Sequence, residues 1–332
     1  MGKFAEHFAG RIDEWDGNMT KLDETLKVWS SVTKSWADLE VIFMESEDIQ
    51  MSLPEDTKRF SGVDSEFKEL MKQAVETPNA IESANKEGRF DSLKNMQGSL
   101  ELCQKSLKDY LDMKKKKFPR FYFMSSEALL TTLSNGSNPP KVVPFLGDCY
   151  DAIKEITFEP PAEEGAIPNV ALDMIAKDGE QVKFYKPFII AGAVENWLND
   201  LTQMQQDTLK HLLHDAQETA VNWDTDPTKP RHIWLEGYPA QLALTAAQIY
   251  WTEETERALD ELEQGQEMAV KQYLGVCVKR LENLIARVLT KLPKALRVKI
   301  ITMITMDVHN RDVVQKLITQ KADSPENFLW VQ

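Results

Sequence analysis

The sequence of 332 residues lacks the long apolar runs and short motifs that identify most membrane proteins and nucleotide-binding enzymes. No apolar run approaches the roughly 18 residues of a membrane-spanning helix, and there is no signal peptide. The phosphate-loop pattern GxxxxGK[ST] is absent, as are GxGxxG, HExxH, GxSxG and the EF-hand loop. We therefore expect an intracellular protein with no catalytic, cofactor-binding or metal site of its own.

Cysteine is scarce, because the chain has only Cys103, Cys149 and Cys277. Their number is odd and they lie far apart, so the pattern indicates neither a disulfide framework nor a zinc site. This usage is typical of a reducing compartment.

Basic residues are fewer than acidic ones, with 39 Lys and Arg residues against 53 Asp and Glu residues. The net charge is −14. Phosphate groups repel such a chain, so we expect no nucleic-acid partner and no membrane partner. Hydrophobic residues make up 42% of the chain and charged residues 28%. That balance is typical of a folded globular protein and not of a disordered one.

Apolar residues in the first third of the chain recur at intervals of three and four, which is the period of an amphipathic helix. The longest stripe comprises Leu22, Leu26, Trp29, Val32, Trp36, Leu39 and Phe43. A second stripe runs over Phe60–Met71 and a third over Leu93–Tyr110, with breaks at Met51–Pro54 and Thr77–Pro78. Three long amphipathic helices with short breaks predict an antiparallel bundle.

The run KKKKFPRFYFMSS at 114–126 predicts a joint between two helices. Lys114–Lys117 complements the negative end of a helix dipole, and a solvated helix end is favoured over a landing site for an acidic surface or for nucleotide phosphate. Pro119 stops the helix, because its ring clashes with the preceding turn and it has no N–H to donate. Ser125 and Ser126 can cap the next helix. For the aromatic residues we favour core packing over partner binding: Phe118, Phe121, Tyr122 and Phe123.

Residues 127–190 combine short helices with the clearest strand signals in the sequence. We expect helices at Glu127–Leu133 and Phe145–Ile156, then alternating apolar residues on both sides of Asp178-Gly179. Because glycine tolerates positive φ, Asp178-Gly179 predicts a hairpin turn. The tip is either an ordinary exposed turn or a candidate contact point, and its residues are Lys177, Asp178, Gly179 and Glu180.

From Ala191 the helical period returns. A short strand is possible within His232–Gln241, and a helical pattern covers Glu253–Leu292, about 60 Å if it is unbroken at 1.5 Å per residue. A last helix is predicted at Lys294–Thr319 after Pro293.

Two groups of residues resemble weak metal or acid–base sites. Asp307, His309 and Asp312 lie close together in the sequence, and His211 and His214 lie three residues apart on a helix. Neither group has a partner set at the fixed spacing of a known site. We favour a surface helix for the first group and a structural role for the second.

Several long stretches resemble one family. FPRFYF at 118–123, followed by a short serine-capped helix, resembles the linker region of dynein heavy chains. Residues 29–71, 244–259 and 299–318, and PENFLW at 325–330, are similar to segments of the same region, in the family's order. The axonemal heavy chains, and the outer-arm beta type among them, are more similar than the cytoplasmic ones.

The resemblance implies a mechanical arm. In dynein heavy chains the linker joins the cargo-side tail to a ring of six AAA+ modules, and it bends and straightens as nucleotide changes. The chain would then be a force-transmitting linker of the cytoplasm and cytoskeleton, in the axoneme of a cilium or flagellum. Its partners would be the ring of the same heavy chain and the other dynein subunits. ATP and magnesium would belong to the ring, and this piece of a longer chain would end before the first module.

We accordingly expect a mainly α fold, with elongated multi-helix bundle subdomains and one inserted β-hairpin or small sheet. The expected subdomains are a helical bundle at 1–118, a joint with short helices and a hairpin at 119–190, and a second bundle at 191–332. The leading candidate for a flexing point is Lys117–Ser126, followed by the loops at 138–144 and 226–230. Its candidate hinge residues are Phe118, Pro119, Arg120, Phe121, Tyr122 and Phe123.

Two other functions stay open. A passive helical scaffold or interaction module is disfavoured by the lone hairpin and by the lack of a repeat. An unrecognised enzyme is the weakest alternative, because no constellation of catalytic residues is visible.

Overall fold

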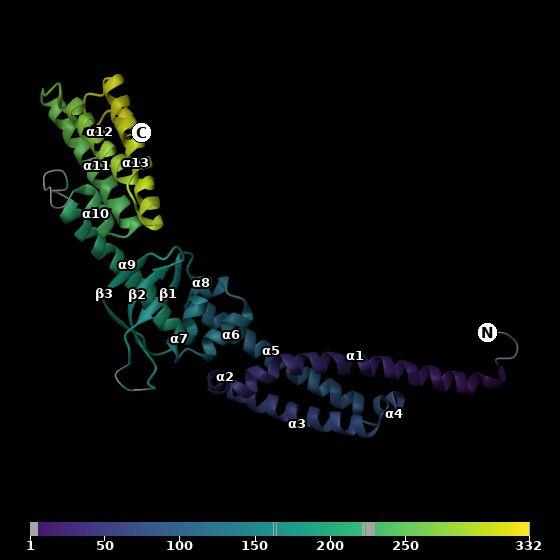
Figure 1. Cartoon of the computed structure of the whole chain (residues 1–332). Helices are drawn as coiled ribbons and strands as arrows, with labels where there is room; N and C mark the ends of the chain where they lie inside the picture. Colours follow the sequence, from purple (N-terminus) through teal and green to yellow (C-terminus); the bar gives the residue numbers. More distant parts are fainter. Residues whose placement is uncertain (1–5, 162, 164, 221–222, 224–229, 332) are drawn as a thin grey trace. The chain divides into compact units, whose positions relative to one another are not determined.

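The computed structural model describes residues 6–161, 163, 165–220, 223 and 230–331. They divide into two compact units, one of residues 1–149 and 192–196 and one of residues 150–191 and 197–332. Helices predominate, and one three-stranded antiparallel sheet is inserted among them (Figure 1). The predicted fold class, mainly helical with a small sheet, is confirmed. The predicted joint at Lys117–Ser126 and the short helices that follow it up to Cys149 belong to the first unit.

The first unit consists of helices joined by short turns. Its α-helices are α1 (Ala9–Glu45), α2 (Glu47–Ser52), α3 (Pro54–Glu76), α4 (Ala80–Ala84), α5 (Arg89–Lys117), α6 (Ser126–Ser134), α7 (Pro139–Val142) and α8 (Leu146–Cys149). Its 3-10 helices are η1 (Glu6–Phe8), η2 (Pro119–Phe123) and η3 (Val143–Phe145). Val194–Asn196, the start of α9 (Val194–Ala220), also belongs to this unit.

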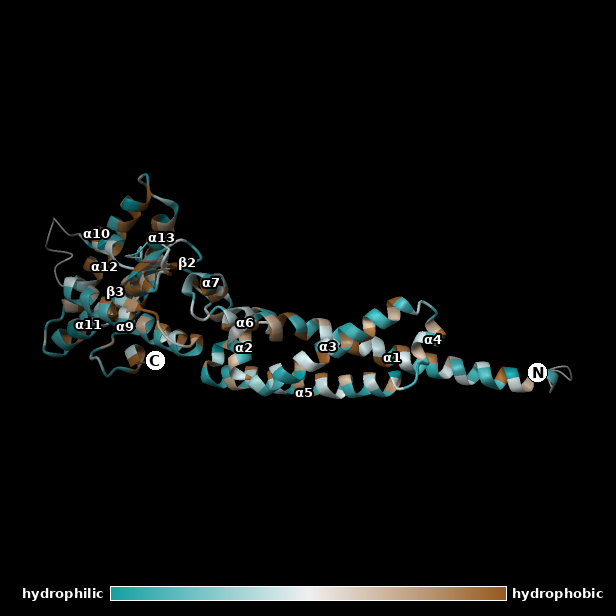
Figure 2. Ribbon diagram, turned by 90° about the horizontal axis from the view of Figure 1, so that it is seen from below, coloured by the Kyte–Doolittle hydropathy of each residue, from teal (hydrophilic) through white to brown (hydrophobic). Residues whose placement is uncertain are grey.

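Helices α1, α3 and α5 pack against one another, and the chain reverses direction between them (Figure 1). Brown hydrophobic and teal hydrophilic residues alternate along these helices in Figure 2, as their period predicts. The shared core includes Val32, Leu39, Phe43, Phe60, Phe67, Leu93, Met96, Leu100 and Cys103. For one member of the longest predicted stripe the expected burial is wrong, because Leu26 is 46% exposed. Thr25 is buried in its place, one residue or about 100° around the helix.

The second unit contains the sheet and the remaining helices. Its elements are β1 (Ile153–Phe158), β2 (Val170–Ala176), β3 (Gln181–Ile189), the rest of α9, α10 (Arg231–Gly237), α11 (Ala240–Glu263), α12 (Ala269–Val288), α13 (Lys294–Thr319) and α14 (Phe328–Val331). No helix of the described residues has both the length and the apolar character needed to cross a bilayer.

The sheet has the order β1-β2-β3, with both neighbouring pairs antiparallel. The predicted hairpin is confirmed as β2–β3, and Gly179 adopts a φ of 90° at its turn. The helix predicted at Phe145–Ile156 is wrong, because only Leu146–Cys149 is α-helical and Ile153 already begins β1. Ile153–Phe158 is a strand because it pairs with β2. A helical period in the local sequence does not outweigh such pairing.

Three further predictions concern the C-terminal helices. The strand considered within His232–Gln241 is wrong, because α10 occupies most of that segment. The helical pattern at Glu253–Leu292 is broken between α11 and α12, where Gly265 adopts a φ of 99° that L side chains rarely tolerate. The last helix, α13, has the predicted bounds.

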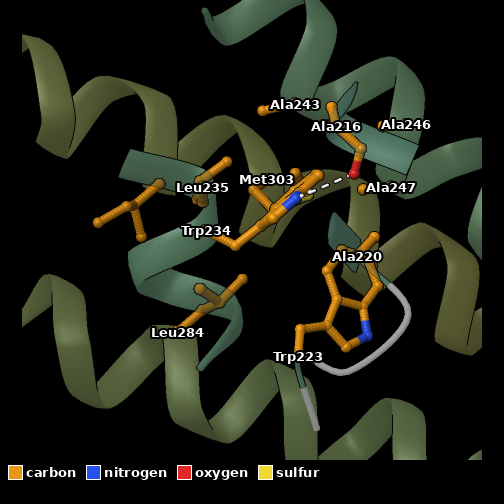
Figure 3. Packing of buried hydrophobic residues seen from close by; sticks show 11 residues of the cluster. Ala216, Ala220, Trp223, Trp234, Leu235, Ala243, Ala246, Ala247, Leu284 and Met303 are labelled. Carbon is orange, nitrogen blue, oxygen red and sulfur yellow. Dashed lines mark hydrogen bonds between the residues drawn. The ribbon is translucent and has the colours of Figure 1, made fainter. Parts of the chain in front are cut away.

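The second unit has a tryptophan-rich core near the end of α9. Trp223 and Trp234 meet edge to face with ring centroids 4.8 Å apart, and small residues surround them (Figure 3). The indole N–H of Trp234 donates to the carbonyl oxygen of Ala216 at 3.1 Å, which is the dashed line in Figure 3. Because Trp234 is buried with its N–H bonded to Ala216, this contact holds α10 against α9.

Candidate functional site

The predicted joint begins where α5 ends. Lys117 is the last residue of α5, and the N–H of Phe118 donates to the carbonyl oxygen of Lys114 at 3.1 Å. Pro119 starts the 3-10 helix η2, so the predicted helix stop is confirmed. The lysine run lies in the last turn of α5, where its charge complements the helix dipole.

The aromatic residues of the joint divide into two pairs. Phe118 and Phe121 are buried and meet edge to face with ring centroids 4.9 Å apart. Tyr122 and Phe123 are 59% and 76% exposed, so the interpretation as core packing is wrong for these two. A 3-10 helix has three residues per turn, which places residues 118 and 121 on one face and turns the other two outward.

The far side of the joint is held by two polar contacts. Ser125 Oγ accepts a hydrogen bond from the N–H of Ala128 at 3.1 Å, which confirms the predicted serine cap of α6. Arg120 Nη1 donates to the carbonyl oxygen of Cys149 at 3.0 Å. Burial, with the nearby charge of Asp148, raises the pKa of the Cys149 thiol to about 12 although Arg120 opposes the rise. Such a shift is typical of a buried structural cysteine, which is protonated at neutral pH.

A buried carboxylate meets the lysine run, and the sequence reasoning missed it. Glu195, the second residue of α9, has a side chain that is 1% exposed. Its Oε1 lies 2.7 Å from Lys114 Nζ and 3.4 Å from Lys117 Nζ. Burial acts to raise the pKa of Glu195, but hydrogen bonds from Lys114, the backbone and Lys117, with the charge of Lys114, hold it below its usual range.

The lysine run therefore contains a largely buried lysine as well as exposed ones. The side chain of Lys114 is 14% exposed and that of Lys117 is 54% exposed, so Lys114 is not part of a solvated helix end. Lys115 Nζ lies 5.7 Å from the ring of Tyr122, and Lys116 is exposed. Sequence reasoning missed Glu195 because it lies 81 residues from Lys114. The one feature of the local sequence that could have pointed to Glu195 is a carboxylate between apolar residues at the start of a helix.

The predicted contact point at the β2–β3 turn is occupied by contacts within the second unit. Asp178 Oδ1 accepts from the N–H of Glu180 at 3.0 Å, which stabilises the turn around Gly179. Glu180 Oε1 accepts from the N–H of Ala240 at 2.8 Å, at the first residue of α11. The carboxylate thus caps a helix N-terminus, where the dipole favours negative charge. The N–H of Lys177 donates to the carbonyl oxygen of Ala152 at 2.9 Å.

The weak metal and acid–base candidates are dispersed. Asp307 pairs with Arg231 and is 8% exposed, so the interpretation as a surface helix is wrong for this residue. Asp312 lies 2.5 Å from the Nη2 of its neighbour on α13. His214 lies 3.4 Å from Glu218 at an exposed position, and the ring of His211 lies 5.7 Å from that of Tyr185. Among the described residues, no group of three metal-ligating side chains converges.

Comparison with known sequences identifies the family. A family model described as "Dynein heavy chain, N-terminal region 2" matches residues 1–216, which include the joint and the start of α9. Over 331 residues the chain is 40% identical to dynein axonemal heavy chain 9 of Homo sapiens, covering 100% of this chain and 7% of that protein.

The chain belongs to the dynein heavy chain family. It is also 40% identical over 329 residues to the ciliary dynein beta chain of Heliocidaris crassispina, covering 99% of this chain and 7% of that one. With the flagellar outer-arm dynein beta chain of Chlamydomonas reinhardtii it shares 38% identity over 323 residues, covering 97% and 7%. This dynein chain thus spans about 7% of the length of the curated relatives it matches.

Proposed function

We propose that this chain is the force-transmitting linker of an axonemal dynein heavy chain, without catalysis of its own. The relatives named above are axonemal, ciliary and flagellar chains, and the similarity extends over the whole chain. Its place of action is then the axoneme of a cilium or flagellum. Its partners are an AAA+ ring of the same heavy chain, which binds ATP and magnesium, and the other dynein subunits.

The mechanical part of the proposal is carried by the ion pair of Glu195. Val194–Asn196 belongs to the first unit, and from Trp197 the same uninterrupted helix belongs to the second. The 2.7 Å contact with Lys114 fastens the first turn of α9 to the end of α5. A charge-assisted bond that is shielded from water is short and stiff. Force carried by α5 therefore enters α9 through this contact as well as through the chain.

The joint remains our candidate for the flexing point. A bend that separates Phe118 from Phe121 exposes a ring that is now buried, and full exposure of such a side chain costs about 1.5–3 kcal/mol. A ligand that shifts a two-state equilibrium from 1:99 to 99:1 supplies about 5.5 kcal/mol. A nucleotide that shifts the ring in this way supplies more free energy than the exposure of one aromatic ring costs. Of the loops proposed as secondary flexing points, 138–144 is mostly helical and 226–229 lies outside the described residues.

The decisive experiment places fluorescent donor and acceptor groups on the linker and on the ring of a full heavy chain. We expect energy transfer to change between the nucleotide-free and ATP-bound motor. The 332-residue chain alone should show no steady ATP turnover. Unchanged energy transfer in a motor that hydrolyses ATP favours a passive scaffold, and turnover by the isolated chain favours an enzyme.

The contribution of the ion pair is tested in microtubule gliding by the full heavy chain. The variant Lys114→Met/Lys117→Met should glide more slowly while it retains its ATP turnover, because force enters α9 less directly. Lys115→Met/Lys116→Met is the matched control, since it also removes two charges from the last turn of α5 but keeps the two lysines that pair with Glu195. Equal gliding velocities in the two variants contradict the assigned role of Glu195.

A further inference from the structure

Four charged side chains of the second unit form two ion pairs against one tryptophan. Arg231 Nη2 lies 2.9 Å from Asp307 Oδ1, and Arg280 Nη2 lies 2.8 Å from Glu254 Oε1. The guanidinium carbons of Arg231 and Arg280 lie 5.1 Å and 5.4 Å from the ring of Trp223. Each carboxylate receives two N–H groups from its arginine, so both charges are paired in place.

A small cavity lies within this group. Its volume is about 20 Å³, and its lining includes Trp223, Trp251, Arg231, Arg280, Asp307 and Asn310. A site of this volume holds one water-sized or monatomic occupant. The lining residues come from α10, α11, α12 and α13 as well as from the segment before α10. An occupant would therefore contact every long helix that follows α9.

Among the residues that the structure describes, three buried donors on the lining have no hydrogen-bond acceptor. They are Nε1 of Trp223, Nε1 of Trp251 and Nε of Arg231. Trp223 is 4% exposed, and the side chain of Arg231 is 10% exposed. Buried polar groups in native proteins nearly always have a partner, so three such donors around one cavity indicate a shared acceptor.

We propose that this cavity binds one monatomic anion, a halide of the size of chloride. A halide accepts from all three N–H groups and donates nothing. A water molecule has two lone pairs, so it can accept from only two of the three N–H groups, and its own two protons also need acceptors. The carboxylate on the lining, Asp307, already accepts two N–H groups from Arg231. The two guanidinium groups against Trp223 add positive potential. This inference does not depend on the linker function.

The first test uses the 332-residue chain in sodium bromide, sodium chloride or sodium methanesulfonate at one ionic strength. Because a ligand that binds only the folded state raises its stability, the unfolding midpoint should rise with either halide and not with methanesulfonate. Crystals grown in bromide should show an anomalous-scattering peak beside the three N–H groups. Equal midpoints in the three salts, or a density peak without anomalous signal, identify a water and overturn the proposal.

The second test removes one donor. Trp223→Phe keeps an aromatic ring beside the two guanidinium groups, and we expect half-maximal stabilisation to need at least threefold more bromide. Trp36→Phe is the matched control, because it removes an indole donor in the first unit, where the N–H donates to Asp64. An unchanged bromide response in Trp223→Phe contradicts the proposal. If that variant does not fold, line broadening of chloride-35 resonances by the wild-type chain decides the question: broadening supports the site and its absence overturns it.

Discussion

Replacing Lys114 with Met measures how much the Glu195 ion pair stabilises the first unit. The substitution keeps most of the apolar stem and removes a cation 2.7 Å from a carboxylate that is 1% exposed. Breaking a buried pair typically costs about 3–5 kcal/mol, because the remaining charge stays buried. In this variant Lys117 Nζ, which lies 3.4 Å from Glu195 Oε1 on a half-exposed side chain, still compensates part of the buried negative charge. We therefore expect the free energy of unfolding to fall by about 2–3 kcal/mol at pH 7.

The pH dependence separates a lost ion pair from lost packing. In the wild-type chain the pKa of Glu195 is depressed, so its stabilisation is present above the unfolded-state pKa of about 4.3 and is lost as pH falls through the lower folded-state value. In Lys114→Met we expect burial to raise the pKa of Glu195 instead. Acidification then neutralises the uncompensated charge in the folded state. The stability difference between variant and wild type should consequently narrow as pH falls from 7 towards 4.

Thermal unfolding followed by circular dichroism measures the difference, and hydrogen exchange of α5 assigns it to the first unit. For a unit of this size 1 kcal/mol corresponds to about 2–4 °C, so the midpoint should fall by about 4–12 °C. Lys116→Met should unfold close to the wild-type midpoint. The reasoning is refuted if the two variants unfold within about 1 °C of each other, or if the loss in Lys114→Met is the same at pH 5 as at pH 7.

Four other substitutions test the packing and capping contacts. Phe121→Ala should lower the free energy of unfolding by about 3–5 kcal/mol, because the ring is fully buried, whereas Phe123→Ala at a 76% exposed position should change it by less than about 0.5 kcal/mol; equal urea midpoints would contradict the assigned packing. Ser125→Ala should cost about 1 kcal/mol and speed amide exchange in the first turn of α6, with unchanged exchange arguing against the cap. Glu180→Gln weakens the cap on the N–H of Ala240, and we expect a loss of about 0.5–1 kcal/mol that shrinks in high salt; a salt-independent loss would point to packing instead.

Local sequence predicted much of the helical fold correctly. The apolar period located α1, α3 and α5, and Pro119, Ser125 and Gly179 marked boundaries that the structure confirms. Each of these signals acts within a few residues of the backbone that it controls, so neighbouring residues contain all the information required. The segment Ile153–Phe158 was predicted to be partly helical and is a strand, because its conformation depends on pairing with β2.

The sequence by itself therefore determined the helical class, the bundle helices, the hairpin turn and the aromatic joint, because these follow from side-chain period and backbone sterics. Only the tertiary structure decided which charges are buried together. Lys114 and Glu195 lie 81 residues apart, and Arg231 and Asp307 lie 76 residues apart. No local pattern encodes such pairs. The free energy of a charged side chain depends on which charges the fold places beside it and on how far it is removed from water.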